Sequence, residues 1–165
     1  MNSRRSKNQT ENRAFTLIEF MIVMVILGIM AALVLPAYSN ATATAKSSAL
    51  KEDIRLLRAQ IALYTTQHRN VPPVGNDFIE QMTGYSDAMG QTSDDADSQY
   101  KFGPYLHQMP VNPLNDSAAL RVVGGNDSFP DEPEGTEGWV YQPSSGRIAP
   151  NVAGEDVEGL AYFDY

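Results

Sequence analysis

One long apolar segment dominates the pattern of hydrophobic and polar positions. From Phe20 to Leu35 sixteen consecutive residues carry no charge, and extending the segment back to Phe15 gives 21 residues, interrupted only by Thr16 and Glu19. A helix of that length spans roughly 31 Å, which matches the hydrocarbon core of a bilayer. The pattern therefore predicts a helix that spans a membrane.

Beyond this segment, apolar residues recur at helical spacing among polar ones. The intervals of 4, 3, 4 and 3 residues place them on a single stripe of a helix. These residues are Leu50, Ile54, Leu57, Ile61 and Tyr64. The predicted helix ends near residues 68–70, before Pro72 and Pro73, because a proline disfavours helix in the residue before it. We expect the stripe to pack on a small sheet. A coiled coil is the alternative, but two heptads are too few to favour it.

The chain after residue 70 reads as a series of short elements. The pattern predicts a short helix that is capped by Asn76 and Asp77, runs through about Met82 and is ended by Thr83 and Gly84, and then an exposed loop over residues 86–99. It further predicts a strand over 119–123 and a hairpin that pairs 139–142 with 147–149. Residues 160–163 form either an edge strand or a disordered tail. The fold class expected is α+β, with a long helix packed on a small antiparallel sheet.

Charge is strongly segregated along the chain. Residues 1–14 and residues 38–69 each carry a net charge of +3, whereas residues 70–165 hold three basic and sixteen acidic residues, a net of −13. The basic residues before the apolar segment favour a cytoplasmic N-terminus, with the rest of the chain outside. The acidic part would repel phosphates, which excludes nucleic acid as a partner. The chain has no cysteine, which excludes disulfides and thiolate metal sites.

Two simpler interpretations of the apolar segment remain open. A cleaved secretory signal could use a site such as residues 41–43, but the apolar core exceeds the usual length of about 7–15 residues. A plain single-span anchor leaves Glu19 unexplained. An acidic residue inside a spanning helix costs about 2.5–3.5 kcal/mol on insertion scales and is expected to have a partner.

The segment from Ala14 to Tyr38, AFTLIEFMIVMVILGIMAALVLPAY, closely resembles the N-terminal segment of type IV pilins and of type II secretion pseudopilins. The match includes the FTLIE opening, a glycine nine residues after Glu19 and a proline eight residues further on. The resemblance implies a pilin-like fold in four parts. These are a cleaved basic leader over 1–14, a membrane and filament-core helix over 15–37, its amphipathic continuation over 38–69, and an acidic periplasmic domain over 70–165.

The resemblance also assigns roles to single residues. It implies that a prepilin peptidase cuts between Ala14 and Phe15 and methylates the new amine of Phe15, although the family usually has glycine before the cut. It implies that Glu19 pairs with the terminal amine of a neighbouring subunit; the alternative is that the Glu19 side chain extends to the membrane interface or is protonated. Because such a pair lies in a low-dielectric environment, it would select the register of subunit addition. Gly28 and Pro36 are expected to soften the helix, and close helix packing is the alternative for Gly28.

Further residues favour the pseudopilin branch of the family. The segments 103–106 (GPYL) and 110–113 (PVNP) are similar to the proline-bracketed turn of the major pseudopilin, where aspartate commonly stands in place of Asn112. The resemblance implies a structural subunit in the inner membrane, which forms a homo-polymer with other pseudopilins on an inner-membrane assembly platform and drives protein export. The alternatives are a type IV pilus subunit and a membrane-tethered binding domain.

Catalytic chemistry has no candidate in this sequence. We find no nucleotide loop, zinc spacing or catalytic triad, and we expect His68 and His107 to be surface residues, so the protein is not expected to be an enzyme. No cofactor is expected apart from calcium, which major pseudopilins often carry in a C-terminal loop. The candidate ligands are Asp127, Asp131 and Glu132, together with Glu134 and Glu137 of the same loop, because carboxylates suit calcium. The alternative is a solvated acidic loop.

Overall fold

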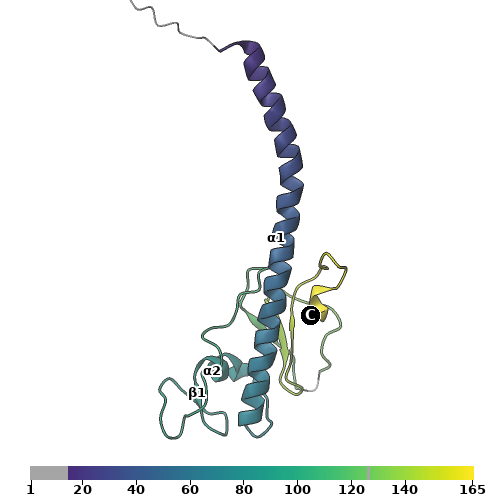
Figure 1. The fold of residues 1–165 in the computed structure, drawn as a ribbon. Helices are drawn as coiled ribbons and strands as arrows, with labels where there is room; N and C mark the ends of the chain where they lie inside the picture. Colours follow the sequence, from purple (N-terminus) through teal and green to yellow (C-terminus); the bar gives the residue numbers. More distant parts are fainter. Residues whose placement is uncertain (1–14, 126) are drawn as a thin grey trace, which may run out of the picture. The chain divides into compact units, whose positions relative to one another are not determined.

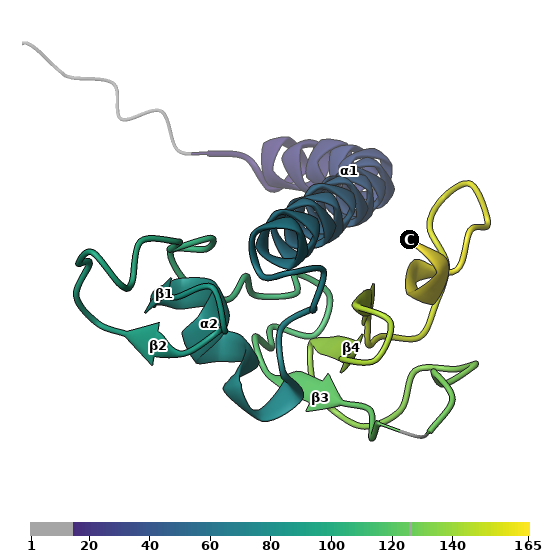
Figure 2. The same cartoon turned by 90° about the horizontal axis from the view of Figure 1, so that it is seen from below.

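The computed structural model describes residues 15–125 and 127–165, with only the main chain at 35–37 and 39. The predicted leader 1–14 lies outside the described residues. The elements, in chain order, are the helix α1 (Leu17–Gln67), the 3₁₀ turn η1 (Gly75–Asp77), the helix α2 (Phe78–Thr83), the strands β1 (Tyr85–Ser86), β2 (Thr92–Ser93), β3 (Leu120–Val122), β4 (Trp139–Gln142) and β5 (Arg147–Pro150), and the 3₁₀ turn η2 (Tyr162–Asp164). The colours of Figure 1 follow the chain from α1 to the C-terminus, and Figure 2 also labels β2, β3 and β4.

The described residues divide into two compact units, with the boundary between Asn40 and Ala41, and α1 contributes to both. In the first unit, the helical stretch Leu17–Val34 is long and apolar enough to cross a membrane, and none of its residues is buried. Among the described residues it is the one stretch with this property. The core helix of a folded domain can be equally long and apolar, but its residues are mostly buried. Because this stretch is exposed, it is not such a core helix.

The second unit is built around the predicted apolar stripe of α1. All five stripe residues are buried in one cluster with residues of the sheet, so the prediction of a helix packed on a sheet is confirmed. The helix ends at Gln67, close to the predicted position. Arg69 and Asn70 follow with φ of 57° and 62°. This left-handed backbone is a common way to terminate a helix.

The larger sheet has the order β3-β4-β5. The predicted hairpin is confirmed, with β4 antiparallel to β5 and Val140 opposite Ala149. The expectation of a wholly antiparallel sheet is wrong at the other edge, because β3 pairs with β4 in parallel. The two strands are joined by residues 123–138, and a connection of that length lets the chain return in the same direction, which a tight hairpin does not allow.

Both faces of the larger sheet are covered. Trp139, Tyr141 and Ile148 point into the cluster with the α1 stripe, whereas Val140 and Ala149 lie in a second cluster. This alternation is the period of two that strands impose on their side chains. The second cluster also contains Phe163 from the C-terminal segment, which therefore closes the face of the sheet that α1 does not cover.

The segment between α1 and the larger sheet differs from the prediction in two respects. The loop expected over 86–99 contains β2, which pairs with β1 in a small antiparallel sheet. The short helix ends at Thr83, as predicted, but Asp77 makes no side-chain capping bond. Gln81 instead accepts a hydrogen bond from the main-chain N–H of Val74. In the two views of Figures 1 and 2, α2 and β1 lie on one side of the last turns of α1 and the C-terminal segment on the other.

The C-terminal tail is neither an edge strand nor disordered. Residues 162–164 form η2, and Phe163 and Tyr165 are buried. The prediction failed because the apolar residues there are held by contacts with distant parts of the chain.

Candidate functional site

The first turn of α1 contains a reciprocal set of hydrogen bonds between Thr16 and Glu19. The Glu19 main-chain N–H donates to Thr16 Oγ1 at 3.3 Å. The Thr16 main-chain N–H and its hydroxyl both donate to Glu19 Oε2, each at 3.0 Å. This is a capping box, which satisfies main-chain donors that a helix start leaves without partners. The Thr-x-x-Glu spacing before an apolar run could have predicted it, but the sequence analysis considered Glu19 only as a partner for another chain.

The predicted maturation site lies at the edge of the described residues. Ala14 is outside them, and Phe15 is 78 % exposed just before the capping box. Glu19 lies four residues after Phe15, and the capping box holds its carboxylate at the start of α1. All residues from Phe15 to Glu19 are exposed to solvent. Cleavage before Phe15 and the pairing of Glu19 with another subunit stay predictions.

Gly28 and Pro36 both lie within the uninterrupted helix α1. A Cβ atom built on Gly28 would meet nothing within 4 Å, so among the described residues no close packing requires a glycine there. A role in softening the helix, or in packing against another chain, stays a prediction for both residues.

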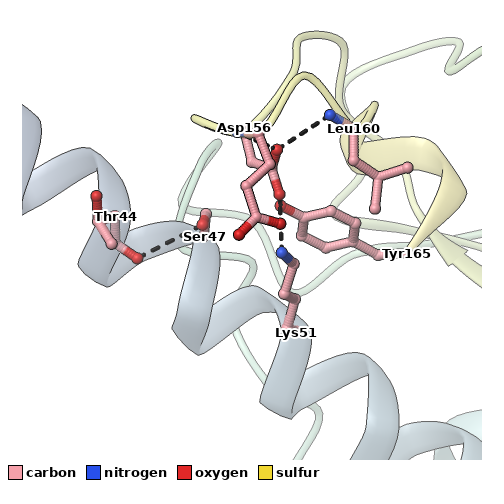
Figure 3. Close-up of polar contacts among 7 residues, drawn as sticks. Thr44, Ser47, Lys51, Asp156, Leu160 and Tyr165 are labelled. Carbon is pink, nitrogen blue, oxygen red and sulfur yellow. Dashed lines mark hydrogen bonds and ion pairs between the residues drawn. The ribbon is translucent and has the colours of Figure 1, made fainter.

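A buried carboxylate fastens the C-terminal segment to α1 in the second unit (Figure 3). The Asp156 side chain is 1 % exposed, and its Oδ2 accepts hydrogen bonds from Lys51 Nζ at 2.8 Å and from the Tyr165 hydroxyl at 2.7 Å. Its Oδ1 accepts the main-chain N–H groups of Glu158 at 2.9 Å and Leu160 at 3.0 Å. We call Lys51, Asp156 and Tyr165 the tail clamp.

The electrostatics of the tail clamp favour its charged form. The Lys51 ammonium, with the Tyr165 hydroxyl, holds the pKa of Asp156 well below its usual range. The hydrogen bond to Asp156 in turn raises the pKa of Lys51. The Lys51 ammonium also lies 4.5 Å from the centre of the Tyr165 ring, which adds a cation–π contact. The paired ions are thus stabilised by several groups at once.

Arg58, two turns along α1 from Lys51, supports the same segment. Its guanidinium donates to the main-chain oxygens of Tyr165 and of Ile148, the second at 3.2 Å. Burial lowers the pKa of Arg58 from its ordinary value. Two basic residues of the predicted amphipathic helix, Lys51 and Arg58, therefore bind the C-terminal segment, a role that helical spacing alone did not indicate.

The predicted calcium ligands do not converge in the described residues. No group of three histidine, cysteine, aspartate or glutamate side chains there is placed to hold a metal ion. In the same loop, the carboxylate of Glu134 accepts a hydrogen bond from Arg121 at 2.6 Å. These carboxylates belong to no such group of three in the described residues, and calcium binding by Asp127, Asp131 and Glu132 stays a prediction.

The proline-bracketed segment surrounds a fully buried asparagine. Asn112 Nδ2 donates to the main-chain oxygen of Gly138 at 2.9 Å, and its Oδ1 accepts the N–H of Leu114 at 3.0 Å. An aspartate could not donate to the Gly138 oxygen unless it were protonated. The amide thus fits this particular backbone, which joins the segment to the start of β4.

His68 is buried, not on the surface as predicted. It is 3 % exposed, stacks on the Tyr64 ring at 3.7 Å, and its Nε2 lies 3.0 Å from the Ser86 hydroxyl oxygen. Its Nδ1 lies 2.8 Å from the Tyr64 main-chain oxygen, so it carries the proton and donates there. The polar bonds explain how a histidine fits into a core. His107 is exposed, as predicted.

Comparison with known proteins gives three results. Residues 10–35 match the model of the prokaryotic N-terminal methylation motif. The chain is 29 % identical over 122 residues to the type II secretion system core protein G of Pseudomonas aeruginosa, an alignment that covers 72 % of this chain and 80 % of the relative. It is 37 % identical over 84 residues to the type IV major pilin protein PilA of Myxococcus xanthus, covering 51 % of this chain and 32 % of the relative. No solved structure matches the chain.

The methylation motif coincides with the capping box and with the exposed apolar helix, and the similarity to the secretion protein extends through most of the chain. The fold agrees, with an apolar N-terminal helix followed by an amphipathic half packed on small sheets. The chain thus carries the N-terminal methylation motif of type IV pilin-like proteins and is similar over most of its length to a type II secretion core protein.

Proposed function

We propose that the chain is a structural subunit of a type II secretion pseudopilus. A prepilin peptidase cuts between Ala14 and Phe15 and methylates Phe15, the helix from Phe15 anchors the subunit in the inner membrane, and residues 70–165 lie in the periplasm. The subunits then polymerise with one another and with other pseudopilins on an assembly platform. The observation that carries this proposal is the apolar stretch Leu17–Val34, none of which is buried, within the methylation motif.

An apolar helix of this length needs a nonpolar surrounding, since burial of apolar surface contributes about 25 cal/mol per Å². Lipid supplies that surrounding in a membrane, and helices of neighbouring subunits supply it in a filament. A single span with no other function would be covered by lipid alone. The similarity to a secretion core protein and to a major pilin supports the filament.

Glu19 would give the polymer its register. A carboxylate among hydrocarbon groups is unfavourable unless it is paired, and the amine created at Phe15 supplies a positive charge on every subunit. The capping box shows that Glu19 also has a role within its own chain. Loss of assembly in a Glu19 variant could therefore arise from either role, and the experiment has to separate them.

Two substitutions make this separation. Glu19→Gln removes the charge but keeps an oxygen that accepts the capping bonds of Thr16, whereas Thr16→Ala removes the threonine hydroxyl and keeps the charge. Both variants are expressed in cells with the complete assembly machinery, and membrane fractionation and recovery of sheared filaments are measured for each. We expect both proteins in the membrane, filaments from Thr16→Ala, and at least a tenfold loss of filaments from Glu19→Gln.

Other results would change the proposal in defined ways. Normal filaments from Glu19→Gln would show that the charge does not direct assembly. If Thr16→Ala loses filaments and Glu19→Gln does not, assembly depends on the capping box and not on the Glu19 charge. If the wild-type chain stays in the membrane and forms no polymer with the machinery present, it is a membrane-tethered binding domain.

A type IV pilus subunit is the second candidate function, and the 37 % identity to a major pilin over 84 residues favours it. Deletion of the gene discriminates between the two. A pseudopilus subunit is required for exported proteins to leave the periplasm, whereas a pilus subunit is required for surface fibres. Unimpaired export together with loss of fibres would establish the pilus function.

A further inference from the structure

The carboxylate of Asp156 has no remaining capacity for another ligand. An ionised carboxylate offers about four lone-pair sites on its two oxygens. Lys51 and Tyr165 occupy those on Oδ2, and the N–H groups of Glu158 and Leu160 occupy those on Oδ1. A metal ion could bind this carboxylate only by displacing one of these donors.

The positive charge in this arrangement comes from a side chain of α1. The salt bridge between Lys51 Nζ and Asp156 Oδ2 measures 2.8 Å, and the lysine side chain is 32 % exposed whereas the aspartate is almost completely buried. Figure 3 shows the lysine rising from α1 toward the aspartate and the tyrosine ring. Lys51 therefore neutralises a buried charge on the C-terminal segment and at the same time joins that segment to the helix.

The neighbouring acidic loop is fastened in a similar way. Arg121 pairs with the Glu134 carboxylate at 2.6 Å. Asn151 accepts the Glu134 main-chain N–H at 2.9 Å and donates to the Glu134 main-chain oxygen at 2.6 Å. Both C-terminal loops thus have their positions fixed by side chains of this chain.

We propose that the Lys51 ammonium is the cation that holds the C-terminal segment 153–165 against α1. Packing of this segment on the helix therefore does not require a bound divalent metal ion such as calcium. The proposal is independent of filament assembly, since it concerns the folded second unit alone. It differs from the expectation that a calcium ion orders a C-terminal loop of this chain.

The test uses the full chain purified in detergent, in buffer with either millimolar calcium or a calcium chelator. The melting temperature of the wild type is expected to be the same in both buffers. Lys51→Met is expected to lower it by at least about 3 °C, equally in both buffers. Arg55→Met is the matched control, because Arg55 lies one turn along the same helix and its pair with Glu52, at 3.9 Å, is largely exposed. That control is expected to change the melting temperature by less than about 1 °C.

Amide hydrogen exchange of the wild type provides a readout that needs no variant. The N–H groups of Glu158 and Leu160 donate to Asp156, so their protection reports directly on the tail clamp. We expect this protection to be unchanged by the chelator. Loss of protection or of melting temperature on chelation would overturn the proposal, and so would a Lys51→Met variant as stable as Arg55→Met. If Lys51→Met does not fold, Tyr165→Phe, which removes one bond to Asp156, is measured in its place.

Discussion

At the scale of single residues, the polar groups of the core are matched to particular partners. The side-chain amide of Asn112 donates to one main-chain carbonyl oxygen and accepts from one main-chain N–H. The carboxylate of Asp156 accepts hydrogen bonds from four donors. Leaving a buried polar group without a partner costs about 1–3 kcal/mol, and more for a charged group. Isosteric changes at these positions are therefore expected to be far more damaging than their size suggests.

The tail clamp gives the second unit a defined response to acid. The groups that face the Asp156 carboxylate are Lys51 from α1, the Tyr165 hydroxyl, and the N–H groups of Glu158 and Leu160. Since these contacts lower the pKa of Asp156, its stabilising effect is complete above the ordinary aspartate pKa of about 4 and is lost as the pH falls below that value.

We predict that Asp156→Asn lowers the melting temperature at pH 7, that the gap to the wild type stays constant down to a pH of about 5, and that it narrows as the pH falls below about 4. The variant keeps the shape of the side chain but cannot titrate, so the difference between the two profiles isolates this one group. Thermal unfolding of both full chains in detergent across this range provides the measurement. A gap that does not change with pH would show that the Asp156 charge contributes nothing to the fold.

At the scale of elements, α1 has two different kinds of surface within the second unit. The stripe that faces the sheet is completely buried, whereas the adjacent positions are open. Leu57 is 0 % exposed and its neighbour Leu56 is 43 % exposed, although the two residues are chemically identical. Helical periodicity was sufficient to predict this difference, because a rotation of one residue along a helix turns the side chain from the core toward solvent.

We predict that Leu57→Ala lowers the free energy of unfolding of the second unit by about 3 kcal/mol. Leu56→Ala, its matched control, is expected to cost less than about 1 kcal/mol, because little buried contact is lost. The chain has a single tryptophan, Trp139, which is fully buried in the cluster that contains Leu57. Its fluorescence during urea unfolding of the full chain reports both values. Equal effects of the two substitutions would contradict the packing described here.

At the scale of the whole molecule, what the sequence could predict depended on how local the determining interactions are. The apolar segment, the α1 stripe and the β4–β5 hairpin follow from periodicity and turn residues within a few positions of one another. The capping box is equally local, and the three-residue spacing of Thr16 and Glu19 is sufficient to predict it. The tail clamp was not, because Lys51 and Asp156 are 105 residues apart and each looks like an ordinary surface charge.

Two further differences have the same origin. The parallel pairing of β3 with β4 depends on the path of a long connection that has no periodic pattern. The burial of His68 depends on Ser86 and on the aromatic side chains that surround it. Neither the path of such a connection nor the partner of a single histidine is encoded in nearby residues. The candidate assembly residues Phe15 and Glu19, in contrast, could be proposed from the sequence because they lie within one contiguous motif, and their role stays a prediction.

The account as a whole requires that the chain be processed at the edge of the apolar helix. The most direct measurement is top-down mass spectrometry of the protein extracted from the membranes of cells that contain the assembly machinery. We predict a chain of residues 15–165 that begins at Phe15 and carries one additional methyl group on its amine. A mature protein that begins at any other residue would contradict the account, because no amine would then lie beside Glu19 to pair with a neighbouring subunit.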